Sequence, residues 1–362
     1  MSGRRDFFRQ AVAVTAGLAT GEASAQQRRA AMPTARASAL MKSFALKYPI
    51  FCAGMGGPTA NPELAIAVSN AGGLGALGTG ANSAAADTVR ERVSRIKSGT
   101  TRPFAVNYLL AFDPNTTLPA ALDAGAPIIQ FAWGIPSVET VAVIRKAGAK
   151  MGVQIGSPAG ARRALDAGAD YLICQGTEAG GHIQATRALY DVLPAVVAEA
   201  KTLPVIAAGG IASGVHIRRA LLAGASGVLI GTRFVATKEA GAHSEYKGAI
   251  IRAKASDTVF TVCFQDGWSN APHRVLRNPT FEKWEAAGCP PAGKRPGEGD
   301  IVATNPVTGP KRRYDATSPQ PDDRGTITDL VMYAGQGVDA IRDIPSAGEL
   351  VERLWKECLA AG

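Results

Sequence analysis

The sequence predicts an α/β protein whose core is a (β/α)8 TIM barrel, with a C-terminal extension packed near the barrel mouth. Three observations support this fold class. From residue 48 onward, short apolar runs alternate with alanine-rich amphipathic stretches, eight such runs occur, and the amphipathic stretches repeatedly end in Ala-Gly. Apolar runs without internal alternation are typical of strands buried on both faces of a parallel sheet. Eight strand–helix repeats favour a closed barrel over an open sheet.

The strands and helices of this barrel can be placed from composition and from the residues that begin and end helices. Asn61-Pro62 supplies an N-cap followed by proline at the first helical position, and pairs such as Ala71-Gly72 supply the glycine that follows a helix. Strands are predicted at residues 49–53, 74–77, 104–108, 128–131, 151–155, 171–174, 205–208 and 227–230. Helices are predicted at residues 61–71, 83–97, 117–124, 137–147, 158–167, 185–200 and 213–223, then near Lys238, 326–337 and 346–360.

Four segments are expected along the chain. Residues 1–25 contain adjacent arginines, Arg4-Arg5, then a mildly apolar run and Ala23-Ser24-Ala25, which resembles a twin-arginine (Tat) signal peptide with its cleavage site. We therefore expect a periplasmic or otherwise exported protein. Residues 26–46 are predicted as a linker, residues 47–245 as the barrel, and residues 246–362 as the C-terminal extension and closing helices.

Composition narrows the classes of partner. The formal net charge is +9, but Lys and Arg are scattered, so we expect attraction for anionic ligands and no nucleic-acid binding. No stretch is long and apolar enough to span a membrane. The five cysteines are far apart with no CxxC spacing, so no metal site is expected, and a disulfide among Cys263, Cys289 and Cys358 is left open.

One histidine stands out as a candidate for proton transfer. The apolar run at residues 171–174 ends in a polar, glycine-rich stretch that leads to Gly180, Gly181 and His182. Histidine can accept or donate a proton near neutral pH, and the glycines would leave its imidazole open to a cavity. A hydrogen-bonded structural histidine is an equal alternative on position alone.

Other polar and glycine residues at strand ends predict a phosphate-bearing aromatic ligand. Gly209-Gly210 and Gly231-Thr232 follow the last two predicted strands, where the loops of such barrels frequently bind phosphate through exposed backbone N–H groups. The neutral amides of Asn107, Gln154 and Gln175 fall at the ends of other strands and suit a heteroaromatic ring. Flavin mononucleotide (FMN) fits both features.

At this point the chain resembles the nitronate monooxygenase family, formerly called 2-nitropropane dioxygenases, which are FMN-containing TIM barrels. The resemblance covers residues 48–244 and returns at residues 332–351. Its motifs are Met55-Gly-Gly, Asn61-Pro-Glu-Leu-Ala, Asn70-Ala-Gly-Gly-Leu-Gly, Val106-Asn107, Val153-Gln154, Glu178-Ala-Gly-Gly-His182, Ala208-Gly-Gly-Ile, Gly231-Thr-Arg-Phe, Tyr333-Ala-Gly-Gln-Gly337 and Ile341-Arg-Asp-Ile-Pro345.

The resemblance implies roles for particular residues. His182 would be the catalytic base or the partner of the substrate anion. FMN would contact Ala53, Gly54, Met55, Asn107, Gln154, Gly180 and Gly181, with its phosphate held by Gly209, Gly210, Gly231 and Thr232. Two positions depart from the family pattern. Gly54 stands where many members have proline, and Ala132-Trp133 stands where many have a histidine, which leaves the substrate open.

By this resemblance the chain is an enzyme that oxidises alkyl nitronates or nitroalkanes with O2, giving a carbonyl compound and nitrite. The alternative is an NAD(P)H-dependent flavin reductase acting on quinones or enoyl thioesters, because such reductases resemble the same segments, including residues 243–247. Export argues against an acyl-carrier substrate. A flavin-carrying protein without catalysis would have no need of His182. The electron donor and the oligomeric state, including a homodimer, are left open.

Overall fold

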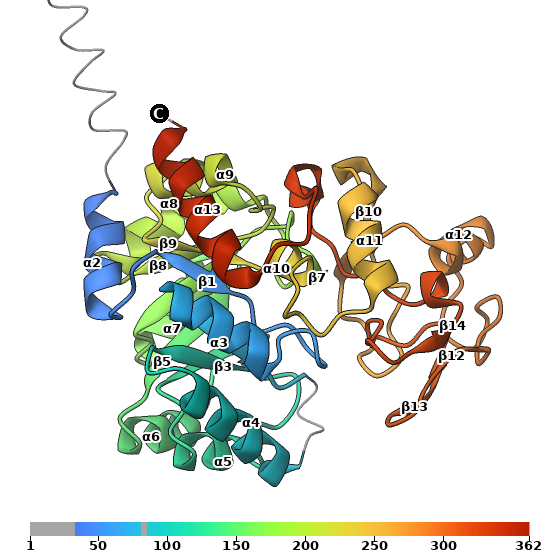
Figure 1. The fold of residues 1–362 in the computed structure, drawn as a ribbon, viewed down its shortest axis with the longest axis horizontal. Coiled ribbons are helices and arrows are strands. Elements are labelled where there is room, and N and C mark those ends of the chain that lie inside the picture. The colour runs from blue at the N-terminus through green and yellow to red at the C-terminus, as the bar shows by residue number, and fades with distance from the viewer. Residues whose placement is uncertain (1–32, 81–84, 362) are drawn as a thin grey trace, which may run out of the picture.

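A closed barrel of parallel strands forms the centre of the molecule (Figure 1). The computed structural model describes residues 33–80 and 85–361. Within them, eight parallel strands pair in the order β1-β9-β8-β6-β5-β4-β3-β2, and a bridge between Phe51 and Leu74 joins the two ends of the sheet. The strands are β1 (Ile50–Cys52), β2 (Gly75–Gly78), β3 (Phe104–Leu109), β4 (Ile128–Ala132), β5 (Lys150–Ile155), β6 (Tyr171–Gln175), β8 (Val205–Ala208) and β9 (Gly227–Ile230). The predicted fold class is confirmed, and each predicted strand overlaps one of these.

Helices surround the barrel as predicted. They are α3 (Pro62–Ala71), α4 (Ala86–Gly99), α5 (Leu118–Asp123), α6 (Val138–Lys146), α7 (Pro158–Asp166), α8 (Leu189–Ala200) and α9 (Gly214–Leu222). The side chain of Asn61 accepts a hydrogen bond from the N–H of Leu64 at 2.8 Å, which makes it the expected N-cap of α3. The last helix, α13 (Ala347–Ala360), packs between α9 and α3 and completes the ring.

Three of the predicted helices differ from the structure, two of them here and the third in the extension. Helix α8 begins at Leu189 and not at residue 185, because the Glu178 carboxylate accepts the N–H of Leu189 at 2.9 Å. No helix begins near Lys238, since its N–H donates to the carbonyl of Pro345. The next helices are α10 (Thr232–Val235) and α11 (Ser244–Arg252).

Residues 326–337 form no continuous helix either. They contribute two short 3-10 turns, η2 (Ile327–Asp329) and η3 (Gln336–Ala340). Between these turns the backbone is extended, because the carbonyl of Met332 accepts the N–H of Leu276 at 2.8 Å and Tyr333 forms a bridge with Val275.

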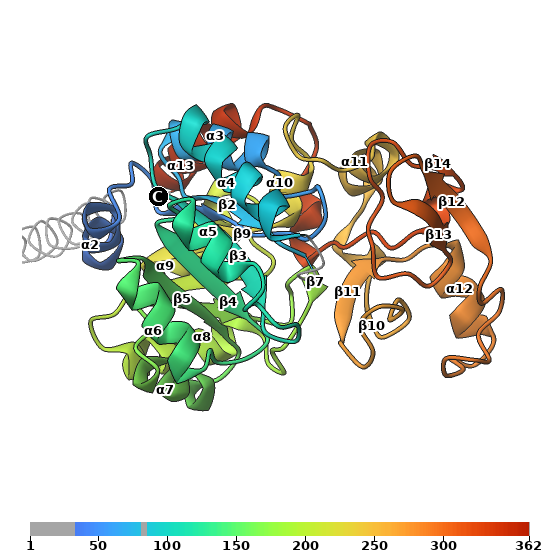
Figure 2. The same cartoon turned by 90° about the horizontal axis from the view of Figure 1, so that it is seen from below.

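The end of the barrel opposite the extension is closed by a helix that the sequence did not predict (Figure 2). Helix α2 (Ala35–Ser43) lies within residues 26–46, the range predicted as a linker. Its Leu40 is fully buried and belongs to the apolar cluster that fills the barrel interior, together with Phe51 and Tyr171. Gly227 leaves the room for it, since a Cβ added at Gly227 would lie 2.8 Å from Leu40 Cδ2. The predicted signal peptide, residues 1–25, lies outside the described residues and stays a prediction.

The extension lies beside the barrel mouth, at the other end from α2 (Figures 1 and 2). One small sheet consists of β10 (Thr258–Thr261), β11 (His273–Leu276) and β7 (Gly181–His182), and a second of β12 (Ile301–Asn305), β13 (Gly309–Arg312) and β14 (Arg324–Gly325), with α12 (Pro279–Ala286) beside them. Because β7 comes from the barrel, the first sheet joins the two parts of the molecule.

Buried ion pairs hold together the part of the extension that is rich in Pro, Gly and charge. Lys311 Nζ lies 2.5 Å from an Asp323 carboxylate oxygen, and Asn305 donates to the other oxygen at 2.8 Å. Arg313 pairs with Asp329 in the same way. Each of these buried charges has a partner of opposite sign. The attraction within each pair therefore offsets the free-energy cost of removing the charges from water.

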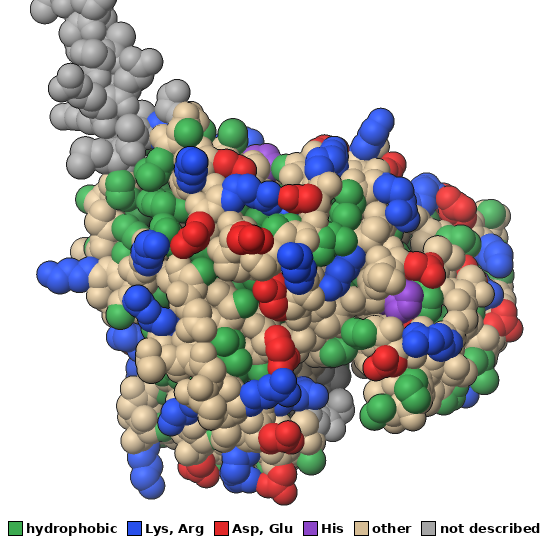
Figure 3. All heavy atoms as spheres, in the orientation of Figure 1, with side chains coloured by type: hydrophobic (Ala, Val, Ile, Leu, Met, Phe, Trp, Pro, Cys, Tyr) green, Lys and Arg blue, Asp and Glu red, His purple; other side chains and the backbone are tan. Residues whose placement is uncertain are grey.

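The outer surface carries both signs of charge. Lys and Arg side chains are interspersed with Asp and Glu on the face shown in Figure 3, which also shows a notch between the barrel and the extension. Among the described helices, none has the length and apolar character that a membrane span requires.

We expect Leu40→Ala to lower the free energy of unfolding by about 2–5 kcal/mol, because it removes a fully buried side chain from the barrel interior and leaves a cavity. Ser38→Ala, on the exposed face of the same helix, is the control and should change it by less than about 0.5 kcal/mol. Urea unfolding of both variants measures the difference. Equal stabilities would show that α2 does not contribute to the barrel core.

Candidate functional site

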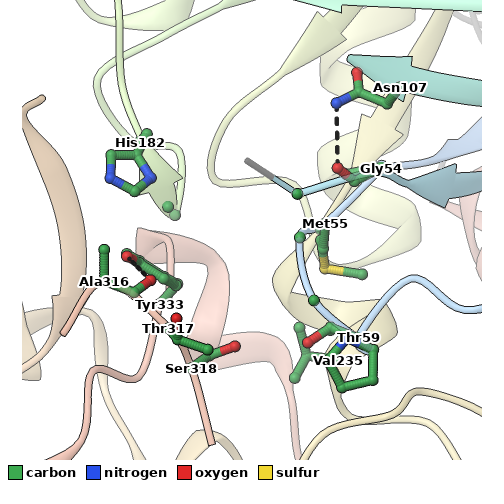
Figure 4. A pocket seen from close by; sticks show the side chains of 18 of the residues that line it. Gly54, Met55, Thr59, Asn107, His182, Val235, Ala316, Thr317, Ser318 and Tyr333 are labelled. Carbon is green, nitrogen blue, oxygen red and sulfur yellow. Dashed lines mark hydrogen bonds between the residues drawn. The ribbon is translucent and has the colours of Figure 1, made fainter. Parts of the chain in front are cut away.

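The carboxyl ends of the barrel strands and the extension enclose a cavity of about 1000 Å³. This is the position at which (β/α)8 barrels carry their active sites. All the residues predicted for the site line this one cavity: Ala53, Gly54, Met55, Asn107, Gln154, Gly180, Gly181, His182, Gly209, Gly210, Gly231 and Thr232. In Figure 4, His182 lies across the pocket from Gly54, Met55 and Asn107.

His182 is held in place by strand pairing rather than by its side chain. It lies in β7 directly opposite His273 of β11, and the next residue, Ile183, donates its N–H to the carbonyl of Pro272 at 2.8 Å. From the barrel side, the Gln175 amide donates to the carbonyl of His182 at 3.2 Å and accepts the N–H of Gln184 at 3.0 Å. Gln175 therefore fixes the His182 segment, whereas we had expected its amide to face a ligand ring.

Aromatic rings surround the imidazole of His182. Trp268 stacks on it with a centroid separation of 4.1 Å and an interplanar angle of 26°, Tyr333 and His273 lie at 5.3 Å, and Trp133 at 6.4 Å. Nε2 is buried and has no hydrogen-bond partner among the described residues. Burial, with a smaller contribution from His273, lowers the pKa of His182 to about 3. The imidazole is therefore neutral at physiological pH, and its buried Nε2 is not held by any hydrogen bond within the described residues.

The neighbouring His273 has the structural role that was the alternative for His182. Its Nδ1 lies 2.9 Å from the carbonyl of Ala271, and its Nε2 accepts the N–H of Phe264 at 3.3 Å. These bonds assign the proton to Nδ1. Burial lowers the pKa of His273 to about 4. Both ring nitrogens of His273 have backbone partners, so this residue supports β11, whereas Nε2 of His182 has none among the described residues.

The glycine loops after β8 and β9 present unused backbone donors to the cavity. Gly209 and Gly210 have φ values of 123° and 65°, which only glycine adopts readily. In the described part of the chain, their N–H groups have no acceptor. The hydroxyl oxygen of Thr232 already accepts a hydrogen bond from the N–H of Gly335 at 3.0 Å, and its O–H remains as a donor. Two free N–H groups beside a hydroxyl form a cradle suited to an anionic group such as phosphate.

Close backbone contacts explain two further glycines of the site. A Cβ at Gly54 would lie 2.2 Å from Asn107 Cβ, and Asn107 Nδ2 donates to the carbonyl of Gly54 at 3.3 Å. A Cβ at Gly180 would lie 2.4 Å from the backbone nitrogen of Gly335. Both glycines are therefore required by packing, and each keeps backbone exposed at the cavity wall.

Sequence reasoning missed several residues that the extension contributes. Tyr333 and Tyr246 line the cavity and are fixed to each other, since the Tyr246 hydroxyl donates to the carbonyl of Tyr333 at 2.6 Å and the Tyr333 hydroxyl donates to that of Ala316 at 2.8 Å. Tyr333 begins the motif at residues 333–337, and Tyr246 lies within residues 243–247. These two segments were therefore the sequence features from which both tyrosines could have been found. Trp268 belongs to no motif, and only the fold brings it to His182. No group of three potential metal ligands occurs among the described residues.

A family model and a curated relative indicate the same family, and a second relative has a different name. The family model described as nitronate monooxygenase matches residues 37–118 and 113–357. A nitronate monooxygenase from Pseudomonas aeruginosa is 30% identical over 365 residues, covering 86% of this chain and 96% of its own. A Mycobacterium tuberculosis protein named (3aS,4S,5R,7aS)-5-hydroxy-7a-methyl-1-oxo-octahydro-1H-indene-4-carboxyl-CoA dehydrogenase is 35% identical over 251 residues, 68% of each chain.

Two solved structures superpose over most of the chain. FabK from Thermotoga maritima superposes with a TM-score of 0.74 at 29% identity, over 88% of this chain and 95% of its own. The nitroalkane oxidase from Streptomyces ansochromogenes superposes with a TM-score of 0.72 at 32% identity, over 89% and 98%.

The burial of His182 predicts a specific dependence of stability on pH. Its pKa is about 3 in the folded protein against 6.5 in the unfolded chain, so below pH 6.5 the unfolded chain binds more protons and folding weakens as pH falls. Between pH 6.5 and 5 this histidine alone should remove about 1.6 kcal/mol of stability. The free energy of unfolding of His182→Gln should therefore fall less between these two pH values than that of the wild type, by the same amount. Urea unfolding of both proteins at the two pH values measures the difference. Identical losses would contradict a neutral buried imidazole.

Proposed function

We propose that this chain, which belongs to the nitronate monooxygenase family of oxidoreductases, uses FMN and O2 to convert alkyl nitronates into carbonyl compounds and nitrite. The observation that carries the proposal is that the neutral imidazole of His182, whose buried Nε2 has no partner among the described residues, lines the same cavity as the free N–H groups of Gly209 and Gly210. The first suits a proton or an anionic substrate, and the second suits the phosphate of a cofactor.

The residues of the cavity fit FMN. Gly209, Gly210, Gly231 and Thr232 would hold the phosphate, because a cradle of glycines lets backbone donors approach an anion without obstruction. The ring would lie against the backbone of residues 53–55 and 180–181, with the amides of Asn107 and Gln154 within the same wall. When bound, FMN would supply the electron acceptor for oxidation of the substrate.

His182 would act through its imidazole in two related ways. For a neutral nitroalkane, the unprotonated nitrogen would take the proton from the carbon that bears the nitro group. For a nitronate, which is already an anion, the negative charge in a poorly solvated cavity would favour a protonated imidazole and so raise its pKa again. The same ring would then donate a hydrogen bond to the anion.

The second candidate is an NAD(P)H-dependent reductase. The observation in its favour is the 35% identity to a protein named as a dehydrogenase of a CoA thioester. Anaerobic mixing of the flavin-loaded protein with propionate 3-nitronate and, separately, with NADH decides between the two, because only the true electron donor will bleach the flavin. Bleaching by NADH alone would favour the reductase.

We predict that Gly210→Val weakens FMN binding about 10- to 100-fold, because the side chain obstructs the cradle and a charge-assisted hydrogen bond is lost. Gly148→Val is the matched control: Gly148 has a similar φ of 69°, and a Cβ there would meet nothing within 4 Å. Flavin content and a titration of the apoprotein with FMN measure the effect. Full flavin content in Gly210→Val would overturn the phosphate assignment.

His182→Ala is predicted to reduce turnover of a neutral nitroalkane about 10²- to 10⁴-fold, and turnover of its preformed nitronate by less, because only the nitroalkane needs a base. Steady-state rates on both substrates, corrected for flavin content, measure the two roles. If both rates fall equally, His182 stabilises the anion and is not a base. Wild-type rates on both substrates from a fully flavinated variant would remove His182 from the mechanism.

A further inference from the structure

We propose that the cavity contains a subsite for an aromatic group attached to the reacting carbon, so that aryl nitronates are preferred over small alkyl nitronates. The subsite is a surface of three rings, Phe112, Trp133 and Trp268, which we call the aromatic wall. All three are half-buried and line the cavity. The inference rests on the function proposed above and names the substrate class within it.

The rings of the aromatic wall come from three separate connections and meet at Trp268. Phe112 follows β3, Trp133 follows β4, and Trp268 lies between β10 and β11. Trp268 contacts Phe112 edge-to-face at 5.2 Å and 67°, and Trp133 at 4.9 Å and 63°. Such tilted contacts are the favourable arrangement of aromatic pairs. The wall is therefore a continuous surface of fixed shape and not three independent side chains.

Trp133 has a left-handed backbone conformation that a side-chain hydrogen bond stabilises. Its φ of 64° is rare for a bulky residue, and it is stabilised by a hydrogen bond from its N–H to the Gln184 side-chain oxygen at 2.7 Å. The amide nitrogen of Gln184 donates in turn to the carbonyl of Gln154 at 2.7 Å. The segment that carries His182 thus also fixes Trp133. Backbone strain of this kind is found mainly at functional sites.

The position of the aromatic wall relative to His182 indicates what it would contact. Trp268 stacks directly on the imidazole of His182, so the wall begins beside this ring. A substrate carbon held next to the imidazole would place its substituent against the adjoining rings. An aryl nitronate is planar and apolar along its ring, and its ring can make the same edge and face contacts that the wall rings make with each other. A methyl or ethyl substituent would leave most of this surface uncovered.

The test compares preformed nitronates of phenylnitromethane and of nitroethane. We expect the wild-type kcat/KM to be at least about tenfold higher for the aryl nitronate. Trp133→Leu and Trp268→Leu keep an apolar side chain and remove the ring, and each should lower the aryl-to-alkyl ratio about tenfold. Because Trp268 touches His182, both rates can fall in that variant, and the ratio is therefore the readout. Phe260→Leu, a half-exposed ring of β10 outside the cavity, is the matched control and should keep the wild-type ratio.

A binding measurement on the wild type separates this inference from the proposed function. Benzoate is a planar anion with an aryl group, and calorimetry should give it an affinity at least about tenfold higher than propionate. If neither nitronate is oxidised but benzoate is preferred, the proposed reaction fails and the subsite stands. If both nitronates are oxidised with equal kcat/KM, or benzoate binds no better than propionate, the aromatic wall does not select aryl groups.

Discussion

The site depends on one short antiparallel pairing, in which Gly181 and His182 of the barrel lie opposite Arg274 and His273 of the extension. Arg274 strengthens this junction, because its buried guanidinium donates two hydrogen bonds, at 3.1 and 2.9 Å, to the carbonyl of Thr177. Without β11, the backbone of Gly181 and His182 would lose its strand partner, and Thr177 would lose the Arg274 guanidinium. The extension is thus part of the scaffold of the candidate site, since it orients His182 and supplies most of the rings around it.

Burial gives the two adjacent histidines different chemistry. His273 satisfies both nitrogens with backbone groups, so its neutral form is fixed by hydrogen bonds as well as by burial. His182 is kept neutral by burial among aromatic rings and retains an unused nitrogen. An apolar enclosure lowers basicity in the empty cavity, yet it also strengthens attraction between the ring and an anion that enters. With these aromatic surroundings, the protonation state of the His182 imidazole therefore depends on the charge of the molecule bound in the cavity.

The barrel and the positions of the site residues could be predicted because both depend on local sequence. Continuous apolar runs marked the strands, and residues such as Gly209 and His182 were found at strand ends, where the fold brings side chains together. Helix α2 was missed because only Ala37 and Leu40 of its nine residues are buried, which leaves a weak periodicity. The contact of Trp268 with His182 joins residues 86 positions apart through β11, and no local pattern records such a pairing.

The position of α13 has a consequence for synthesis. This helix packs between α9 and α3, although about 120 residues separate it from α9 along the chain. A ribosome releases the chain from its N-terminus, so all eight barrel strands emerge while the groove between α3 and α9 is still uncovered. The buried side chains of α13, among them Leu350 and Leu354, are synthesised after all eight strands. The ring of helices therefore closes only once this later segment has emerged, and until then the nascent chain exposes an apolar groove between α3 and α9.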